Sequence, residues 1–142
     1  MKNNRKKVMI LTNHSYMLYR FRKELIEELM KNYDVVLSMP FVGHHEDFIN
    51  MGLRCIETKM ERRGVNPIHD FSLMKFYKKI LQEENSDLVI TYSIKPNVYG
   101  GLMCEKLNIP FYANVQGLGT AFQKPGLAQF ATVLYKTAFK KT

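Results

Sequence analysis

Five short apolar runs of strand length recur along the chain, and the segments between most of them carry apolar residues at helical spacing. The runs are residues 7–12, 34–39, 53–59, 87–92 and 110–115, and helices are predicted over about 18–32, 44–52, 70–84, 97–107 and 127–138. Each run is apolar at most positions rather than at every second one, which is typical of parallel strands covered on both faces. The pattern predicts a single α/β domain over residues 1–142, a doubly wound parallel sheet of the Rossmann-like kind.

The composition narrows the kinds of partner. The 21 Lys and Arg against 13 Asp and Glu give a net charge of +8, which favours an anionic partner: nucleic acid, a phosphorylated small molecule or an acidic membrane surface. Most aromatic residues fall at helical spacing, which disfavours a single-stranded nucleic-acid surface. No apolar run approaches the roughly 20 residues of a membrane-spanning helix, so neither a span nor a signal peptide is expected. Cys55 and Cys104 lack metal-type spacing and are predicted to be reduced core thiols.

The turn after the first run carries polar side chains where a doubly wound sheet binds ligands, outside the carboxyl ends of its strands. It contains Asn13, His14, Ser15 and Tyr16 but no glycine-rich phosphate motif, so neither a dinucleotide cofactor nor a P-loop is expected. Asn13 or Ser15 can cap the following helix. His14 is either a ligand-facing residue or a hydrogen-bonded structural histidine.

The turn after the fourth run reads "YSIKPNVYGG". Pro96 suits the first turn of a helix, and Asn97 can satisfy a backbone donor nearby. Lys95 beside a helix N-terminus is unfavourable unless a negative group lies between them, which predicts an anion such as a phosphate; the alternative is a solvated lysine. Gly100 and Gly101 are expected to bring the helix close to the sheet or to a neighbour.

Two further loops are candidate binding segments. After the fifth run, "VQGLGTAF" offers Gln116, Gly117, Gly119 and Thr120, whose glycines let backbone N–H groups approach a ligand. This loop is also expected to be mobile. In "ERRGVNP", Arg62 and Arg63 can hold a diphosphate or remain a solvated pair. Because these turns follow strands, Lys95 and one or both arginines are expected to face the same crevice as His14.

Four segments together carry a family resemblance over nearly the whole chain: "VMILTNHSYMLYRFRKELI", "RRGVNPIHDFSLM", "DLVITYSIKPNVYGG" and "IPFYANVQGLGTAF". They resemble the N-terminal half of bacterial family 4 glycosyltransferases, and most closely the branch that builds capsule, O-antigen and related glycans on a polyprenyl-diphosphate carrier. The resemblance implies a two-domain GT-B protein of which this chain is the first domain, with the nucleotide-sugar domain outside it. It also implies transfer with retention of configuration and without a metal.

The resemblance further implies that this domain receives the lipid-linked sugar acceptor through the loops that hold Asn13 to Tyr16, Lys95 to Asn97 and Gln116 to Thr120. Many relatives have a glycine pair in the first loop and a histidine after the fifth strand, where this chain has "HSYM" and Gln116. The enzyme is expected on the cytoplasmic face of the membrane, held by basic and aromatic clusters on its helices. The alternative is a non-enzymatic Rossmann-like module that binds an anionic metabolite or a lipid surface. The basic and aromatic clusters are Tyr19, Arg20, Arg22 and Lys23; Lys75, Lys78 and Lys79; and Lys136, Lys140 and Lys141.

Overall fold

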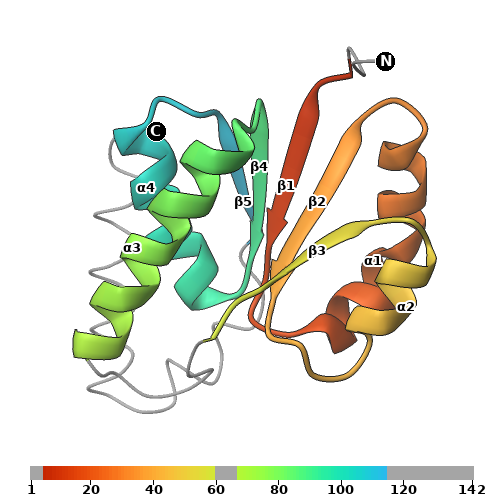
Figure 1. The fold of residues 1–142 in the computed structure, drawn as a ribbon, viewed down its shortest axis with the longest axis horizontal. Helices are drawn as coiled ribbons and strands as arrows, with labels where there is room; N and C mark the ends of the chain where they lie inside the picture. Colours follow the sequence, from red (N-terminus) through yellow and green to blue (C-terminus); the bar gives the residue numbers. More distant parts are fainter. Residues whose placement is uncertain (1–4, 60–66, 115–142) are drawn as a thin grey trace.

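A computed structural model of the chain describes residues 5–59 and 67–114, and within them a five-stranded sheet forms the centre of the fold (Figure 1). All neighbouring strands pair in parallel, in the order β3-β2-β1-β4-β5. The predicted doubly wound α/β fold is therefore confirmed. The strands are β1 (Lys7–Leu11), β2 (Asp34–Met39), β3 (Arg54–Glu57), β4 (Leu88–Tyr92) and β5 (Phe111–Asn114).

Helices cover both faces of this sheet. On one face lie α1 (Ser15–Met30) and α2 (His45–Asn50), and on the other lie α3 (Pro67–Glu84) and α4 (Gly101–Lys106), which is preceded by a π-helical turn, η1 (Pro96–Gly100) (Figure 1). Alternate residues of β1 serve the two sides: Met9 and Leu11 join the core under α3, and Ile10 joins the core under α1. Of the helices described, none is both long enough and apolar enough to cross a bilayer.

The strand order reverses between β1 and β4, which lie side by side at the centre of the sheet. The chain leaves β1 toward α1 on one face and leaves β4 toward η1 on the other face (Figure 1). Because these two connections run to opposite faces of the sheet, they leave a crevice at the carboxyl ends of β1 and β4. This crevice is the usual ligand site of doubly wound sheets.

The glycine pair after β4 has the packing role predicted for it. A Cβ on Gly100 would lie 2.7 Å from Leu11 Cδ1, and one on Gly101 would lie 2.9 Å from Phe111 Cε2. Both positions are buried. Only glycine lets this segment lie so close to β1 and β5, so the expected close approach to the sheet is confirmed.

Element bounds differ from the predictions mainly at helix starts. Helix α1 begins at Ser15 rather than near Leu18, and α3 begins at Pro67 rather than near residue 70. Apolar residues at helical spacing from Leu18 predicted this helix, and a core stripe through Phe21 and Leu25 is wrong: they are 53% and 41% exposed, because the buried stripe runs through Ser15, Leu18 and Ile26. The last predicted helix, over 127–138, lies outside the described residues.

Candidate functional site at the strand-order reversal

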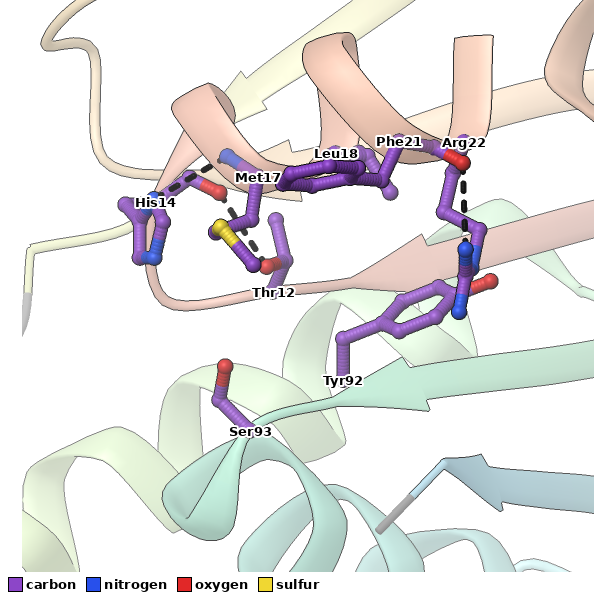
Figure 2. A pocket seen from close by; sticks show the side chains of 8 residues that line it. All are labelled: Thr12, His14, Met17, Leu18, Phe21, Arg22, Tyr92 and Ser93. Atoms are coloured by element: carbon purple, nitrogen blue, oxygen red, sulfur yellow. Dashed lines mark hydrogen bonds between the residues drawn. The ribbon is translucent and has the colours of Figure 1, made fainter. Parts of the chain in front are cut away.

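A pocket of about 440 Å³ lies at the carboxyl ends of β1 and β4, under the first turns of α1 (Figure 2). Its volume falls in the range of about 300–1,000 Å³ that is usual for small-molecule sites. Its position is the one expected for a ligand site in this fold. Its lining is Thr12, His14, Met17, Leu18, Phe21, Arg22, Tyr92 and Ser93.

One side of the pocket is apolar, and the Arg22 side chain lies at its end. Met17 and Phe21, one helical turn apart on α1, face it, and the Tyr92 ring lies across from them at the end of β4 (Figure 2). The Arg22 guanidinium lies 5.8 Å from the centre of the Tyr92 ring. Burial raises the pKa of the Tyr92 phenol, and the charge of Arg22 and its hydrogen bond oppose that rise, so the phenol is neutral near pH 7.

The polar floor ties together the turns that follow β1 and β4. The Ser93 hydroxyl donates to Asn13 Oδ1 at 2.8 Å, and the Thr12 hydroxyl donates to the carbonyl oxygen of His14 at 3.2 Å. Ser93 has a φ of 78°, a left-handed backbone that non-glycine residues seldom adopt. Such backbone strain clusters at functional sites and persists where surrounding contacts hold it.

His14 is both a structural residue and part of the pocket. It is the N-cap of α1, where its Nδ1 accepts from the backbone N–H of Met17 at 3.4 Å. The prediction that Asn13 or Ser15 caps this helix is therefore wrong. Asn13 is engaged by Ser93, and Ser15 already lies within the helix.

Ser15 and Tyr16 lie outside the pocket lining. Ser15 is buried, and its hydroxyl donates to the Val42 carbonyl and accepts from the backbone N–H of His44, which fixes the loop after β2 to the start of α1. Tyr16 is exposed, and its hydroxyl accepts a hydrogen bond from Arg20.

Lys95 is not a solvated lysine. Its ammonium lies 2.9 Å from Asp70 Oδ1 in α3, and the two side chains are only 11% and 8% exposed. The Tyr99 hydroxyl donates to the other carboxylate oxygen at 2.9 Å. Burial, and then the bond to Asp70, raise the pKa of Tyr99. Asp70 thus places a negative group that belongs to the chain itself beside Lys95.

Asp70 was missed by the sequence reasoning. The available signal was a single acidic residue at the start of a helix in the otherwise basic segment "RRGVNPIHD". The pocket residues Met17 and Tyr92 were also not predicted as binding residues, and Arg22 was predicted only in a membrane-binding cluster. Nothing in the sequence shows which exposed side of α1 faces β4.

Asn97 holds the neighbouring strand ends together. It is fully buried, accepts from the Thr91 hydroxyl at 2.6 Å and donates to the Asn114 carbonyl at 2.8 Å. It therefore links the ends of β4 and β5 beside the crevice. Lys95 is outside the pocket lining, so the expectation that Lys95 and His14 share a crevice stays a prediction.

The remaining predicted site residues, Arg62, Arg63, Gln116, Gly117, Gly119 and Thr120, lie outside the described residues. So do the expected mobile loop and the terminal lysine cluster. Across residues 5–59 and 67–114, no group of three His, Cys, Asp or Glu side chains could hold a metal ion.

Comparison with known proteins places these features in context. No protein-family model matches the chain. A curated relative from Campylobacter jejuni, N,N'-diacetylbacillosaminyl-diphospho-undecaprenol alpha-1,3-N-acetylgalactosaminyltransferase, is 27% identical over 141 residues. This relative is a glycosyltransferase. The match covers 94% of this chain but only 38% of the relative, so the chain spans about two fifths of its length.

Solved structures of glycosyltransferases and related nucleotide-sugar enzymes share the fold. They include MurG of Acinetobacter baumannii (TM-score 0.62, 14% identity, 76% of this chain and 33% of that one) and a glycosyltransferase of Rickettsia africae (0.62, 16%, 89% and 35%). A UDP-GlcNAc 2-epimerase of Methanocaldococcus jannaschii also matches (0.61, 19%, 94% and 38%). The resemblance to GT-B glycosyltransferases is confirmed by the relative and by this fold, whereas membership of family 4 stays a prediction.

Proposed function

We propose that the complete protein containing this chain is a glycosyltransferase that moves a sugar from a nucleotide sugar onto a polyprenyl-diphosphate-linked saccharide. The observation that carries the proposal is the pocket at the ends of β1 and β4, in a domain matched over 94% of its length by a glycosyltransferase whose name specifies a diphospho-undecaprenol acceptor. Residues 1–142 form the acceptor side of the enzyme. The donor is held mainly by a second domain, and the resemblance implies retention of configuration without a metal.

The acceptor sugar enters the pocket beside His14 in this proposal. The turn from Asn13 to Tyr16, together with Lys95 and Asn97, shapes the edge of the site, and Arg62, Arg63 and the loop from Gln116 to Thr120 complete it. Catalysis by such a domain consists of holding the acceptor hydroxyl in line with the donor and stabilising the leaving diphosphate. Rigid turns serve this purpose well, and the bonds between Asn13 and Ser93 and from Asn97 to Asn114 make the strand ends rigid.

The carboxyl edge of the domain also suits the surface of an anionic membrane. Exposed apolar side chains occur near the starts of both α1 and α3, which lie at the same end of the molecule (Figure 1). Cations lie among them: Arg20 packs on Tyr16, and Lys75 packs on Phe71. We place the enzyme peripherally on the inner face of the plasma membrane, where its substrate is embedded. The exposed apolar residues near these two helix starts are Tyr16, Met17, Phe21, Ile68 and Phe71.

Transfer by the complete protein tests the proposal. Purified protein is incubated with a panel of UDP-sugars and the diphospho-undecaprenol acceptor named for the Campylobacter relative, and the lipid-linked product is detected by mass spectrometry. A product longer by one sugar is expected. His14→Ala lowers kcat/KM by about tenfold or more, because the imidazole lines the acceptor pocket. Lys31→Ala, at the opposite end of α1, is the control and leaves the rate unchanged.

Binding of acceptor without transfer from any donor would favour the non-enzymatic module instead. If the protein shows no acceptor binding and no sugar transfer, this result contradicts both the enzyme and the binding module as functions of the pocket.

A further inference from the structure

The carboxylate of Asp70 lies outside the pocket, yet it holds the turn that forms part of the pocket floor. We propose that Asp70 is a positioning residue for the proposed transfer: through Lys95 it keeps the turn after β4 in the shape that presents Ser93 to the acceptor. The inference rests on the proposed function and goes beyond it, because Asp70 is absent from the pocket lining and acts without touching the substrate.

Both oxygens of the Asp70 carboxylate are engaged. Oδ1 lies 2.9 Å from the Lys95 ammonium, and Oδ2 accepts from the Tyr99 hydroxyl at 2.9 Å. The Lys95 and Asp70 side chains are only 11% and 8% exposed, so little water competes for either charge. A pair buried in this way stays closed, because either charge alone would be left in the interior without a counter-charge. The first turn of α3 is thereby fixed to the turn after β4.

The segment that this pair holds includes a strained residue of the pocket. Ser93, two residues before Lys95, has a φ of 78°, in the left-handed region. Its hydroxyl donates to Asn13 Oδ1, and its carbonyl accepts from the backbone N–H of Asn97 at 2.9 Å. A strained backbone persists only where the contacts around it over-determine its conformation. The ion pair of Lys95 is one of the contacts that keep Ser93 in place.

Lys95 acts on the turn rather than on the ligand. Its charge is offset by Asp70, its side chain is nearly buried, and it is outside the pocket lining. An anionic ligand would have to displace a carboxylate that Tyr99 also holds. The pair therefore shapes the site without contacting the substrate.

Packing alone does not account for a charged pair at this place. Apolar side chains of similar volume are often as stable as a buried ion pair, or more stable. They would hold the turn without fixing its direction, whereas the Asp70 carboxylate accepts from two donors at defined positions. Figure 2 shows the Ser93 hydroxyl directed toward the side of the pocket that holds Thr12. A requirement that this hydroxyl keep one position on the floor accounts for the directional contact.

Initial rates of the complete protein test the proposal, with the diphospho-undecaprenol acceptor varied at saturating UDP-sugar and the UDP-sugar varied at saturating acceptor. Asp70→Asn should raise the KM of the acceptor by about tenfold or more, since a misplacement of about 1 Å in an active site can cost about 100-fold. The KM of the donor should be unchanged, because a second domain holds the donor. A smaller folded fraction would lower the apparent kcat and leave both KM values unchanged, so this split identifies a positioning role.

Two further variants decide the question even if Asp70→Asn folds poorly. Tyr99→Phe removes only the second donor to the carboxylate, and it should raise the acceptor KM by a smaller factor. Asp70→Asn combined with Lys95→Met removes both buried charges, so it should regain stability in urea denaturation but keep the raised acceptor KM. Leu53→Ala is the control: it truncates a buried residue next to the edge strand β3, destabilises the core, and should leave both KM values unchanged.

The outcomes separate the two levels of inference. A normal acceptor KM in the double variant would mean that the pair serves stability alone, and a lower acceptor KM in Asp70→Asn would mean that the freed Lys95 ammonium binds a phosphate directly. A rise shared equally by donor and acceptor would place the effect outside the acceptor pocket. Each of these results overturns the positioning role but leaves the glycosyltransferase in place. Absence of transfer by the wild-type protein to every acceptor counts against the proposed function and removes this inference with it.

Discussion

At the scale of single residues, the ion pair between Asp70 and Lys95 is the contact whose loss should lower the stability of the protein most. It joins the first turn of α3 to the turn after β4, and both side chains are almost fully buried. A buried pair holds its shape because neither charge can be solvated when the other leaves. Asp70 therefore fixes where the ammonium of Lys95 lies, and Tyr99 fixes Asp70.

Asp70→Asn should lower the free energy of unfolding by about 3–5 kcal/mol, because it leaves the Lys95 cation buried without a counter-charge. Urea denaturation measures the loss. Asp47→Asn removes an exposed carboxylate that pairs with His44 and serves as the control, at a cost of less than about 1 kcal/mol. Adding Lys95→Met to Asp70→Asn should recover part of the loss. Equal costs for the two aspartates would contradict the buried pair.

Gly100 offers a second test at the scale of one residue. Gly100→Ala places a methyl group 2.7 Å from Leu11 Cδ1, so overpacking should cost about 1–3 kcal/mol in urea denaturation. The cost should shrink in a Leu11→Val background, which removes the opposing atom. Gly52→Ala has nothing within 4 Å and is strained by its φ of 95° instead, so its cost should be the same in both backgrounds. If Gly100→Ala costs the same stability in the wild-type and Leu11→Val backgrounds, residue 100 does not pack against Leu11.

At the scale of elements, α1 combines a capping function with a wall of the pocket. Its N-cap, His14, makes a long hydrogen bond of 3.4 Å, so loss of the cap should have a modest effect. His14→Ala should destabilise the protein by about 0.5–1 kcal/mol, whereas His14→Asn should stay within about 0.5 kcal/mol of the wild type because asparagine is a preferred cap. Thermal unfolding followed by circular dichroism compares the two. Equal destabilisation of both variants would mean that His14 contributes through something other than its cap.

The sequence allowed most of these elements to be predicted, because buried parallel strands and amphipathic helices leave strong periodic signals. The runs that became β1, β2 and β4 were predicted to within one residue at each end. The orientation of α1 was harder. Phe21 and Leu25 fit a helical stripe, yet they are exposed, because the helix rotates to bury Ser15, whose hydroxyl holds the loop after β2.

The candidate site was predictable only in part, because its contacts join residues far apart in the chain. Its location after β1 and β4 followed from the fold class, and His14 was among the candidates. The bonds from Ser93 to Asn13 and from Lys95 to Asp70 depend on tertiary packing that leaves no periodic signal. Tyr92 was placed only as the end of a strand, and its ring reaches the pocket because β4 lies next to β1.

At the scale of the whole molecule, the buried thiol of Cys104 makes the free energy of unfolding fall at alkaline pH. Burial raises the pKa of Cys104 from 9.0 to about 12, so the folded state holds this proton more tightly than the unfolded state does. The resulting stability is fully present below about pH 9 and is lost as pH rises toward 12. Unfolding free energies from urea titrations at pH 8 to 11 should fall, by up to about 1.4 kcal/mol per pH unit for this thiol.

Cys104→Ala separates this group from others that titrate in the same range, including Cys55, whose pKa is raised to about 11. Its pH slope should be shallower by the contribution of one thiol. A stability that is flat or rising from pH 9 to 11 would contradict the burial of these groups.

The membrane proposal also belongs to the whole molecule, because it depends on clusters carried by separate helices. The complete protein should float with vesicles that contain acidic lipid at low salt and should detach as salt rises, since each lysine or arginine near an anionic surface contributes about 1 kcal/mol and is screened by ions. Neutral vesicles should not bind it. Replacing Arg20 and Lys23 with glutamine should weaken flotation, and equal binding to neutral and acidic vesicles at high salt would rule out electrostatic docking.

The π-helical turn at Pro96–Gly100 makes chain length matter here as much as residue type. A π turn holds one residue more than the α-helical turn that it replaces. Deleting a single residue from it would restore an α-helical turn and leave the residues that follow facing nearly as they do now, because the turn holds its extra residue as a bulge. The glycine pair would then still face Leu11 and Phe111. Adding a residue that no bulge takes up would instead rotate everything that follows by about 100°, the angle per residue of an α-helix, and would bring bulkier side chains against the sheet. Related chains should therefore tolerate the loss of one residue between β4 and α4 better than the gain of one.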